Sequence, residues 1–222
     1  MNKQSVISVY GPPGSGKGTQ AHKLADNFGF EHIDTGRVIE KKVHNPDLYD
    51  DPIIQREKKN FDDGILCTPE WVFEIVMNEI KEIHKLGKGI LFSGSPRTLP
   101  EVEKMAPYLE DLYGKENIYI LRLNINPETS IFRNSHRRIC EKCGQSIFYS
   151  PENEKLEQCP KCNGRLVIRT LDKPETIKVR LEEYEQRTKP VHEFLKKRGI
   201  KVIDIDGEPP IEQVYQNILK VL

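Results

Sequence analysis

The stretch at residues 11–19 reads GPPGSGKGT and follows a short apolar run, SVISVY, at residues 5–10. Its glycines and its lysine have the spacing of a phosphate-binding loop, G-x-x-x-x-G-K-[ST], in which backbone N–H groups approach phosphate oxygens closely. One position departs from that pattern, because Gly18 replaces the expected hydroxyl and Thr19 follows one residue late. Apolar residues at helical spacing then continue to Gly29, so the stretch predicts a strand, a phosphate loop and a helix that together bind a nucleotide.

The composition indicates a soluble globular chain that needs no disulfides to stabilise its core. The 222 residues are 36% apolar and 31% charged, and 34 basic residues balance 34 acidic ones. A net charge of zero argues against a general nucleic-acid or membrane-surface binder. The first residues show no export signal, and no apolar run is long enough to span a membrane. We therefore expect a cytoplasmic protein with no nucleic-acid partner and no membrane partner.

Beyond the loop, short apolar runs alternate with segments of helical periodicity. The apolar runs lie at residues 5–10, 89–92, 118–123 and 201–206. The helical segments lie at residues 16–29, 69–87, 99–114, 127–137, 173–199 and 209–222. Thr68 and Asp172 stand where helices are expected to begin, and Pro190 is expected to kink the longest segment. Alternating strands and helices predict an α/β fold, a doubly wound parallel sheet flanked by helices.

Four of the five cysteines form two C-x-x-C pairs inside a segment with little helical character, residues 138–170. Fifteen residues separate the two pairs, whose members are Cys140, Cys143, Cys159 and Cys162. This is the spacing of a zinc site, and four thiolates would leave no open coordination position, so the predicted zinc is structural. The alternatives are a disulfide pair and an independent zinc ribbon that binds nucleic acid. Cys67, the fifth cysteine, is predicted to be a small buried side chain.

Five stretches, taken in order, give the chain a resemblance to the adenylate kinase family. They are GPPGSGKGTQ at 11–20, DTGRVIE at 34–40, SGSPRTLPE at 93–101, RNSHRRICEKCG at 133–144 and LDKPETIKVRLEEYEQRTKPV at 171–191. The resemblance implies a monomeric phosphotransferase of nucleotide biosynthesis that moves a phosphoryl group from Mg²⁺·ATP to a nucleoside monophosphate. It also implies a P-loop core with a parallel sheet of about five strands, at residues 1–137 and 171–222. A flap at about 34–70 would bind the monophosphate, and a zinc-binding lid would span 138–170.

The resemblance also assigns site residues. The ATP site would include Gly14, Ser15, Gly16, Lys17, Gly18, Thr19, Arg133 and Arg137. The monophosphate site would include Thr35, Gly36, Arg37, Glu40, Gly94, Arg97, Glu101, Arg169 and Arg180. Phosphoryl transfer depends on positioning and on stabilising negative charge, so the catalytic residues would be the cations Lys17, Arg97, Arg133, Arg169 and Arg180. Arg133 and Arg137 stand four residues apart, so one helix face could present both. The family also carries G-K-G-T in its loop, which makes Gly18 the expected residue.

The departures from the family pattern gather on the monophosphate side. Ser93 replaces the family aspartate that orders water around magnesium, and Glu101 replaces the glutamine that reads adenine. An ionised glutamate only accepts hydrogen bonds, so Glu101 suggests a shift from AMP toward a base edge rich in N–H donors, such as guanine. The family has an aspartate at the position of Arg37 and an arginine at the position of Glu40, so the two charges are exchanged in this chain. We expect either that Arg37 replaces part of the missing arginine or that the two residues form a surface ion pair.

These departures leave two functions open. One is an adenylate-kinase-like enzyme that converts ATP and a nucleoside monophosphate to two diphosphates, with AMP as the family's acceptor. The other is a nucleotide-binding regulatory or assembly protein that keeps the fold and turns over weakly. The lost aspartate favours the second function, and the arginines around the lid favour the first.

Overall fold

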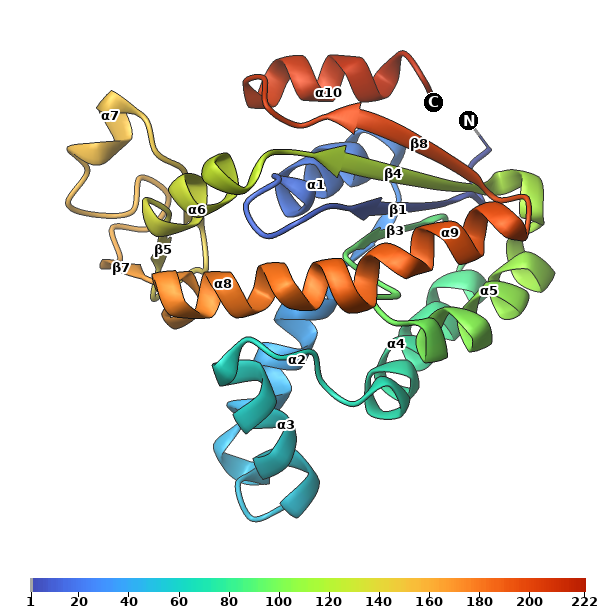
Figure 1. Cartoon of the computed structure of the whole chain (residues 1–222), viewed down its shortest axis with the longest axis horizontal. Coiled ribbons are helices and arrows are strands. Elements are labelled where there is room, and N and C mark those ends of the chain that lie inside the picture. Colours follow the sequence, from blue (N-terminus) through green and yellow to red (C-terminus); the bar gives the residue numbers. More distant parts are fainter. Residues whose placement is uncertain (1) are drawn as a thin grey trace.

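A five-stranded parallel sheet forms the centre of the computed structural model, which describes residues 2–222 (Figure 1). The strand order is β2–β3–β1–β4–β8. The strands are β2 (Glu31–Ile33), β3 (Ile90–Ser93), β1 (Val6–Tyr10), β4 (Ile118–Asn124) and β8 (Lys201–Asp206). Each neighbouring pair is parallel. The predicted doubly wound parallel α/β fold is therefore confirmed.

Helices cover both faces of the sheet, because successive side chains of β1 point to opposite sides. Ile7 and Val9 pack into an apolar cluster with residues of the two helices on one face, α1 (Lys17–Phe28) and α10 (Ile211–Leu219). Val6 and Tyr10 pack into a second cluster with residues of three helices on the other face. Those helices are α4 (Pro69–Lys85), α5 (Leu99–Tyr113) and α9 (Lys189–Lys197). The buried parallel strands bring their carboxyl ends to one edge of the sheet, where α/β folds bind ligands.

Two expectations about these elements need correction. β2 has no match among the predicted strands, because it is a three-residue edge strand with two partly exposed side chains, Glu31 and His32. The predicted long helix is divided into α8 (Pro174–Glu183), a π-helical turn at Tyr184–Thr188 and α9. Pro190 has no N–H for an α-helical hydrogen bond and its ring crowds the preceding turn, so the helix widens just before it.

The helices beside the lid also begin and end differently from expectation. α6 runs over Pro127–Ser135, so Arg137 lies beyond its end. Asp172 does not start a helix, because it ends a 3₁₀ turn at Thr170–Asp172 and Lys173 caps α8. Arg137 and Asp172 therefore both lie outside the α-helices, where they form an ion pair. None of the helices described for residues 2–222 has the length and apolar character to cross a membrane.

Two excursions leave the parallel sheet. The flap holds α2 (Thr35–Val43), a turn at Pro46–Leu48 and α3 (Pro52–Asp63), which project away from the sheet in Figure 1. The lid is an antiparallel sheet with the order β6–β5–β7. Its elements are β6 (Ser146–Ile147), β5 (Arg138–Cys140), β7 (Leu166–Ile168) and the short helix α7 (Pro151–Glu154). The boundaries expected for the flap, 34–70, and for the lid, 138–170, stay predictions.

Candidate functional site

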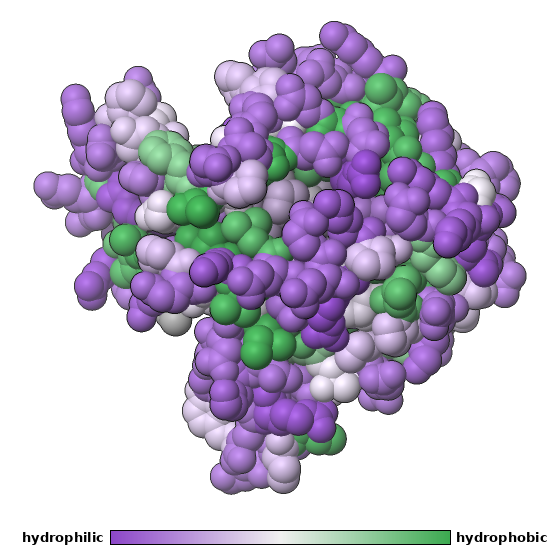
Figure 2. All heavy atoms as spheres, viewed as in Figure 1, coloured by the Kyte–Doolittle hydropathy of each residue, from purple (hydrophilic) through white to green (hydrophobic). Residues whose placement is uncertain are grey.

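A cavity of about 920 Å³ opens at the carboxyl ends of β1 and β3. Tyr10 and Ser93, the last residues of those strands, contribute to its wall. The P-loop at residues 11–19, the flap, the lid, α8 and the start of α10 supply most of the remaining lining. Figure 2 shows a notch in the surface between the lid and the α10 end of the core. The volume and the position at the sheet edge are those of a site for small molecules such as nucleotides.

The P-loop needs glycine for steric reasons. Gly14 and Gly16 have left-handed φ values of 79° and 85°, a conformation that favours glycine. A Cβ on Gly14 would also lie 2.9 Å from the Ser130 carbonyl oxygen. α1 begins at Lys17, so its free N–H groups and the positive end of its dipole face the loop. This backbone shape is suited to binding phosphate.

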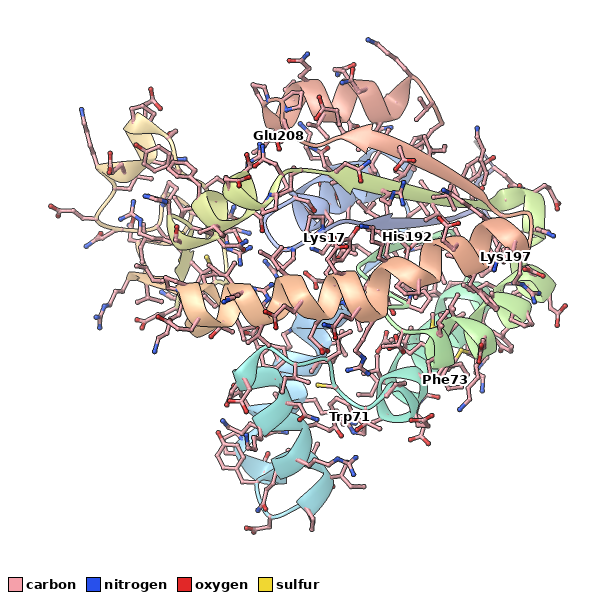
Figure 3. All side chains as sticks on the ribbon, viewed as in Figure 1. Lys17, Trp71, Phe73, His192, Lys197 and Glu208 are labelled. Atoms are coloured by element: carbon pink, nitrogen blue, oxygen red, sulfur yellow. The ribbon has the colours of Figure 1, made fainter. Side chains whose placement is uncertain are left out.

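Lys17 projects from the first turn of α1 (Figure 3), and its ammonium group donates a 3.1 Å hydrogen bond to the Pro12 carbonyl oxygen. Burial, and then the guanidinium groups of Arg97, Arg180 and Arg137, lower the pKa of Lys17 well below its ordinary value. Burial and Arg137 likewise lower the pKa of Arg180 to about 9. The four cations repel one another, and an anion of high charge would relieve that repulsion.

Asp172 orients two of these arginines. Its carboxylate is fully buried and accepts hydrogen bonds from Arg137 at 2.7 and 2.9 Å and from Arg180 at 3.3 Å. A buried carboxylate between two guanidinium groups fixes their direction and leaves part of their charge for a ligand. The sequence analysis missed this role, because only the folded chain brings residue 137 beside residue 172. The expectation that Arg133 and Arg137 share a helix face is wrong, since Arg137 lies beyond α6.

Arg133 lies near the α10 side of the cavity. Its guanidinium group donates to the carbonyl oxygens of Gly207 and Glu208, both at 2.8 Å, so it is fixed between α6 and the loop before α10. Phe132 and Tyr149 are nearly half exposed and line the same cavity, with ring centroids 5.2 Å apart. Exposed aromatic faces and a flat guanidinium group are surfaces on which a base can stack. The sequence analysis did not identify these two aromatic residues.

Arg37 and Glu40 contact the lid and its flank, not each other. Glu40 forms a two-point ion pair with Arg169, with Oε2–Nη2 and Oε1–Nε distances of 2.7 and 3.2 Å. Arg37 donates to the Gly144 carbonyl oxygen at 3.2 Å, and its Nε lies 3.5 Å from the Asp34 carboxylate. The expected surface ion pair between Arg37 and Glu40 is therefore wrong. That Arg37 replaces part of the missing arginine stays a prediction.

Comparison with known proteins identifies the family. The family model described as adenylate kinase matches residues 9–200. The chain belongs to the adenylate kinase family. It is 36% identical over 219 residues to the adenylate kinase of Caldicellulosiruptor saccharolyticus, covering 97% of this chain and 98% of the relative. It is 33% identical to the adenylate kinases of Caldanaerobacter subterraneus subsp. tengcongensis (97% and 95% covered) and Methanosarcina barkeri (97% of each).

At residue 93, the adenylate kinase resemblance predicts an aspartate, but this chain has a serine that pairs with a histidine. Ser93 is buried, and its Oγ lies 3.0 Å from Nε2 of His32 on the neighbouring strand. Burial lowers the pKa of His32, which favours the neutral form of its ring. The two side chains satisfy each other and supply no negative charge at this point of the adenylate kinase fold.

Two residues assigned from the adenylate kinase resemblance do not line the cavity. Glu101 is buried, and its carboxylate accepts hydrogen bonds from the Thr98 hydroxyl at 2.7 Å and the Arg97 N–H at 3.0 Å. These bonds resemble a capping box at the start of α5, so the carboxylate is engaged near its own helix end. Thr35 is buried, and its Oγ1 has no partner among residues 2–222. The suggested contact between Glu101 and guanine has no support in this geometry, and the roles of both residues stay predictions.

The fold brings most of the predicted site residues together. Those that line the cavity are Gly14, Ser15, Gly16, Lys17, Gly18, Thr19, Gly36, Arg37, Glu40, Gly94, Arg97, Arg133, Arg137, Arg169 and Arg180. Among the further lining residues that the sequence analysis did not identify are Asp34, Leu66 and Glu183. An acidic residue directly after a strand, such as Asp34, is a sequence signal for a residue of the binding site. It was missed because β2 was not predicted.

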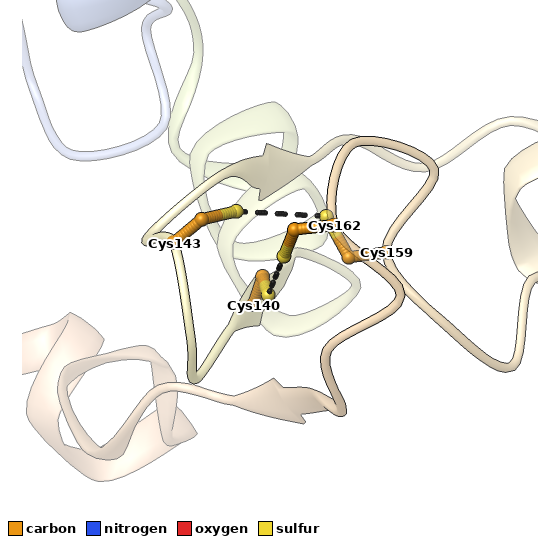
Figure 4. Close-up of side chains that lie close together, drawn as sticks. All are labelled: Cys140, Cys143, Cys159 and Cys162. Carbon is orange, nitrogen blue, oxygen red and sulfur yellow. Dashed lines mark hydrogen bonds between the residues drawn. The ribbon is translucent and has the colours of Figure 1, made fainter.

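The four lid cysteines converge on one point (Figure 4). Their Sγ atoms lie within 4.8 Å of one another, with 3.4 Å between Cys140 and Cys162 and 3.6 Å between Cys143 and Cys159. A disulfide has an S–S distance of about 2.05 Å, whereas four thiolates around one zinc ion stand about 3.8 Å apart. A Cβ on Gly164 would lie 2.7 Å from the Cys140 sulfur, so this glycine makes room for the cluster. The disulfide alternative is therefore wrong, and the cluster has the geometry to hold zinc.

Proposed function

We propose that this protein catalyses the reversible transfer of the γ-phosphoryl group of ATP to AMP, which gives two molecules of ADP. The observation that carries the proposal is the set of cations around a glycine-rich loop in one cavity: Lys17, Arg97, Arg137 and Arg180. Such a set suits two phosphate chains that meet end to end. Membership of the adenylate kinase family, and the name adenylate kinase carried by its relatives, support ATP and AMP as the substrates.

Each part of the cavity has a proposed role. The P-loop would bind the phosphates of ATP through its backbone N–H groups, and Lys17 would bind the β and γ phosphates. Arg133 and the aromatic residues beside it would hold the adenine of ATP. Arg97, Arg169 and Arg180 would place the acceptor phosphate in line with the γ phosphorus. The acceptor phosphate is itself the nucleophile, so no strong base is needed, and the cations stabilise the charge on the transferred group.

Magnesium would accompany ATP, as it does in other P-loop kinases. Thr19, in the first turn of α1, and Asp34, after β2, both line the cavity and carry oxygen atoms. Oxygen is the ligand that Mg²⁺ prefers, either directly or through the waters that the ion keeps, so these residues fit the ion. When bound, Mg²⁺ neutralises charge on the β and γ phosphates during transfer.

We also propose that the four-cysteine cluster holds a structural Zn²⁺. Within residues 138–169, Ile147 is the only buried aliphatic side chain, so the lid needs a further source of stability. A site with four thiolates is closed and takes no part in the chemistry. The ion would keep β7, and with it Arg169, in place above the flap.

A nucleotide-binding regulatory protein with weak turnover is the second candidate. The observation that favours it is the Ser93–His32 pair, because residue 93 lacks the carboxylate expected from the family pattern and its loss would slow the transfer. The four cations in the cavity favour the enzyme. A monomeric state, a cytoplasmic location and the lack of nucleic-acid and membrane partners stay predictions.

A coupled assay for ADP formation separates the two candidates. The purified protein receives Mg²⁺·ATP with AMP, GMP, CMP, UMP or dTMP in turn, and Lys17→Met serves as the inactive reference. We expect AMP to be the best acceptor by about tenfold or more in kcat/KM, and Lys17→Met to lose about 10³-fold in kcat. Nucleotide binding without ADP formation would establish the regulatory candidate. A faster reaction with GMP would refute AMP as the acceptor.

A further inference from the structure

We propose that Asp34 replaces the missing carboxylate at position 93 and orders the water shell of magnesium in bound Mg²⁺·ATP. The inference rests on the proposed function, because it assigns a positioning residue for the same reaction. It accounts for metal-dependent transfer in a chain that carries serine at residue 93.

Strand register places Asp34 beside Ser93. β2 and β3 pair in parallel, with Ile33 opposite Phe92. One further step puts Asp34, the residue after β2, opposite Ser93, the last residue of β3. Paired residues of neighbouring parallel strands project from the same face of the sheet. Asp34 therefore offers a carboxylate on the strand next to β3, at the same position along the sheet as Ser93.

His32 identifies that shared face. His32 and Asp34 are two residues apart, so they project from the same side of the chain. The His32 ring reaches across to Ser93, with Nε2 3.0 Å from Oγ. The Ser93 hydroxyl is thereby engaged, while Asp34 lies nearer the carboxyl edge and lines the cavity with Lys17 and Thr19.

Asp34 is also the carboxylate of the cavity wall that lies nearest to Ser93 in the order of the sheet. Among residues 2–222, three carboxylates line the cavity: Asp34, Glu40 and Glu183. Glu40 is held by Arg169 in a two-point ion pair. Glu183 accepts hydrogen bonds from a backbone N–H and from Arg187, each at 2.9 Å. Of the three, Asp34 alone directly follows a strand of the parallel sheet, β2, beside the strand that ends at Ser93.

The local contacts of Asp34 leave room for that water. Its Oδ1 accepts the Arg37 N–H at 3.2 Å and so caps α2, whereas its Oδ2 lies 3.5 Å from Arg37 Nε, beyond a normal hydrogen bond. The side chain is 30% exposed, so it is partly hydrated. Its negative charge opposes the fall in the pKa of Lys17, with which it shares the cavity wall. A partly hydrated carboxylate near the phosphate-binding lysine suits an outer-shell contact with Mg²⁺.

Binding measurements test Asp34 without requiring turnover. ATP is titrated into the protein by calorimetry, once with excess Mg²⁺ and once with EDTA, and the ratio of the two Kd values is the metal preference. Asp34→Asn keeps an oxygen for the cap of α2 and removes the charge. We expect its metal preference to fall about tenfold, while the Kd for metal-free ATP stays within about twofold or becomes tighter. An unchanged metal preference overturns the role of Asp34.

Asp51→Asn is the matched control. Asp51 caps α3 in the same way, by accepting the Ile53 N–H at 2.8 Å, but it does not line the cavity. This control should keep the metal preference of the wild type. Asp34→Asn combined with Ser93→Asp should regain most of the lost preference, because a carboxylate returns at the same level of the adjacent strand. No regain in a folded double variant contradicts the inference that the two positions serve one role.

The experiments distinguish a wrong inference about Asp34 from a wrong proposed function. A wild-type protein that binds Mg²⁺·ATP but forms no ADP refutes the proposed function, and the binding ratio still tests Asp34. A protein that forms ADP, and whose metal preference is unaffected by Asp34→Asn, refutes the inference alone.

Discussion

The two sides of the cavity balance their charges to different degrees. The loop half, which comprises the P-loop with Arg137 and Arg180, gathers cations around one buried carboxylate, Asp172. Burial and the neighbouring guanidinium groups, first among them Arg97 of the flap half, lower the pKa of Lys17. In the flap half, which comprises α2 and residues 93–101, Glu40 forms an ion pair with Arg169. The departures from the family pattern lie in the flap half, and the better-matched motif lies in the loop half.

This difference indicates how each half would respond to a ligand. In the loop half, repulsion between the cations is relieved when phosphate binds, so electrostatic attraction contributes directly to affinity. In the flap half, a phosphate must compete with an ion pair that already exists, which lowers affinity. The same ion pair holds the flap against the end of the lid before a ligand arrives.

Among changes that test this comparison, the largest effect is expected from disordering the lid that contacts the flap. Cys140→Ser should lose the zinc, disorder the lid and lower ADP formation about 100-fold, because Arg169 and its partner Glu40 lose their fixed geometry. The parallel core should stay folded, since its two apolar clusters lie outside the lid. Metal analysis, the rate of ADP formation and thermal unfolding measure these three outcomes.

Cys67→Ala is the control for the loss of a cysteine. Cys67 is buried in the core, as predicted, and burial raises the pKa of its thiol to about 12. This variant should keep its zinc and most of its activity. A Cys140→Ser protein that retains stoichiometric zinc and full activity would show that four thiolates do not hold the lid together.

An intermediate effect is expected from Glu40→Gln, which removes the charge that pairs with Arg169. Without this partner Arg169 becomes available to the acceptor phosphate, so the KM for AMP should fall about three- to tenfold with little change in the KM for ATP. Steady-state rates against AMP at saturating ATP give the value. Glu103→Gln, an exposed position on α5, is the control and should match the wild type. A rise in the KM for AMP would mean that the ion pair helps to form the acceptor site.

The smallest effect is expected from Glu101→Gln, which restores the amide of the family pattern. The Thr98 hydroxyl and the Arg97 N–H keep an oxygen acceptor, because the glutamine carbonyl replaces a carboxylate oxygen. The ratios of kcat/KM among AMP, GMP and CMP should change by less than about twofold. A large gain in kcat/KM for AMP would show that residue 101 contacts the base, although Glu101 is engaged with Thr98 and Arg97 in this structure.

Local patterns in the sequence were sufficient for the P-loop and for the cysteine cluster. The glycine and lysine spacing at residues 11–19 specifies a backbone shape within a single turn, and each C-x-x-C pair has its own local geometry. Alternating apolar runs and helical segments likewise indicated a parallel sheet. The short strand β2 was missed because three residues, two of them polar and partly exposed, give no periodic signal.

The partners of the charged groups became known only from the folded chain. Arg137 meets Asp172, and Arg169 meets Glu40, across 35 and 129 residues. Asp34 and Ser93 are neighbours because β2 lies beside β3, a strand order that periodicity does not encode. A sequence reveals which residues carry charge, but the energy of an ion pair depends on distance and burial, and those are properties of the three-dimensional packing.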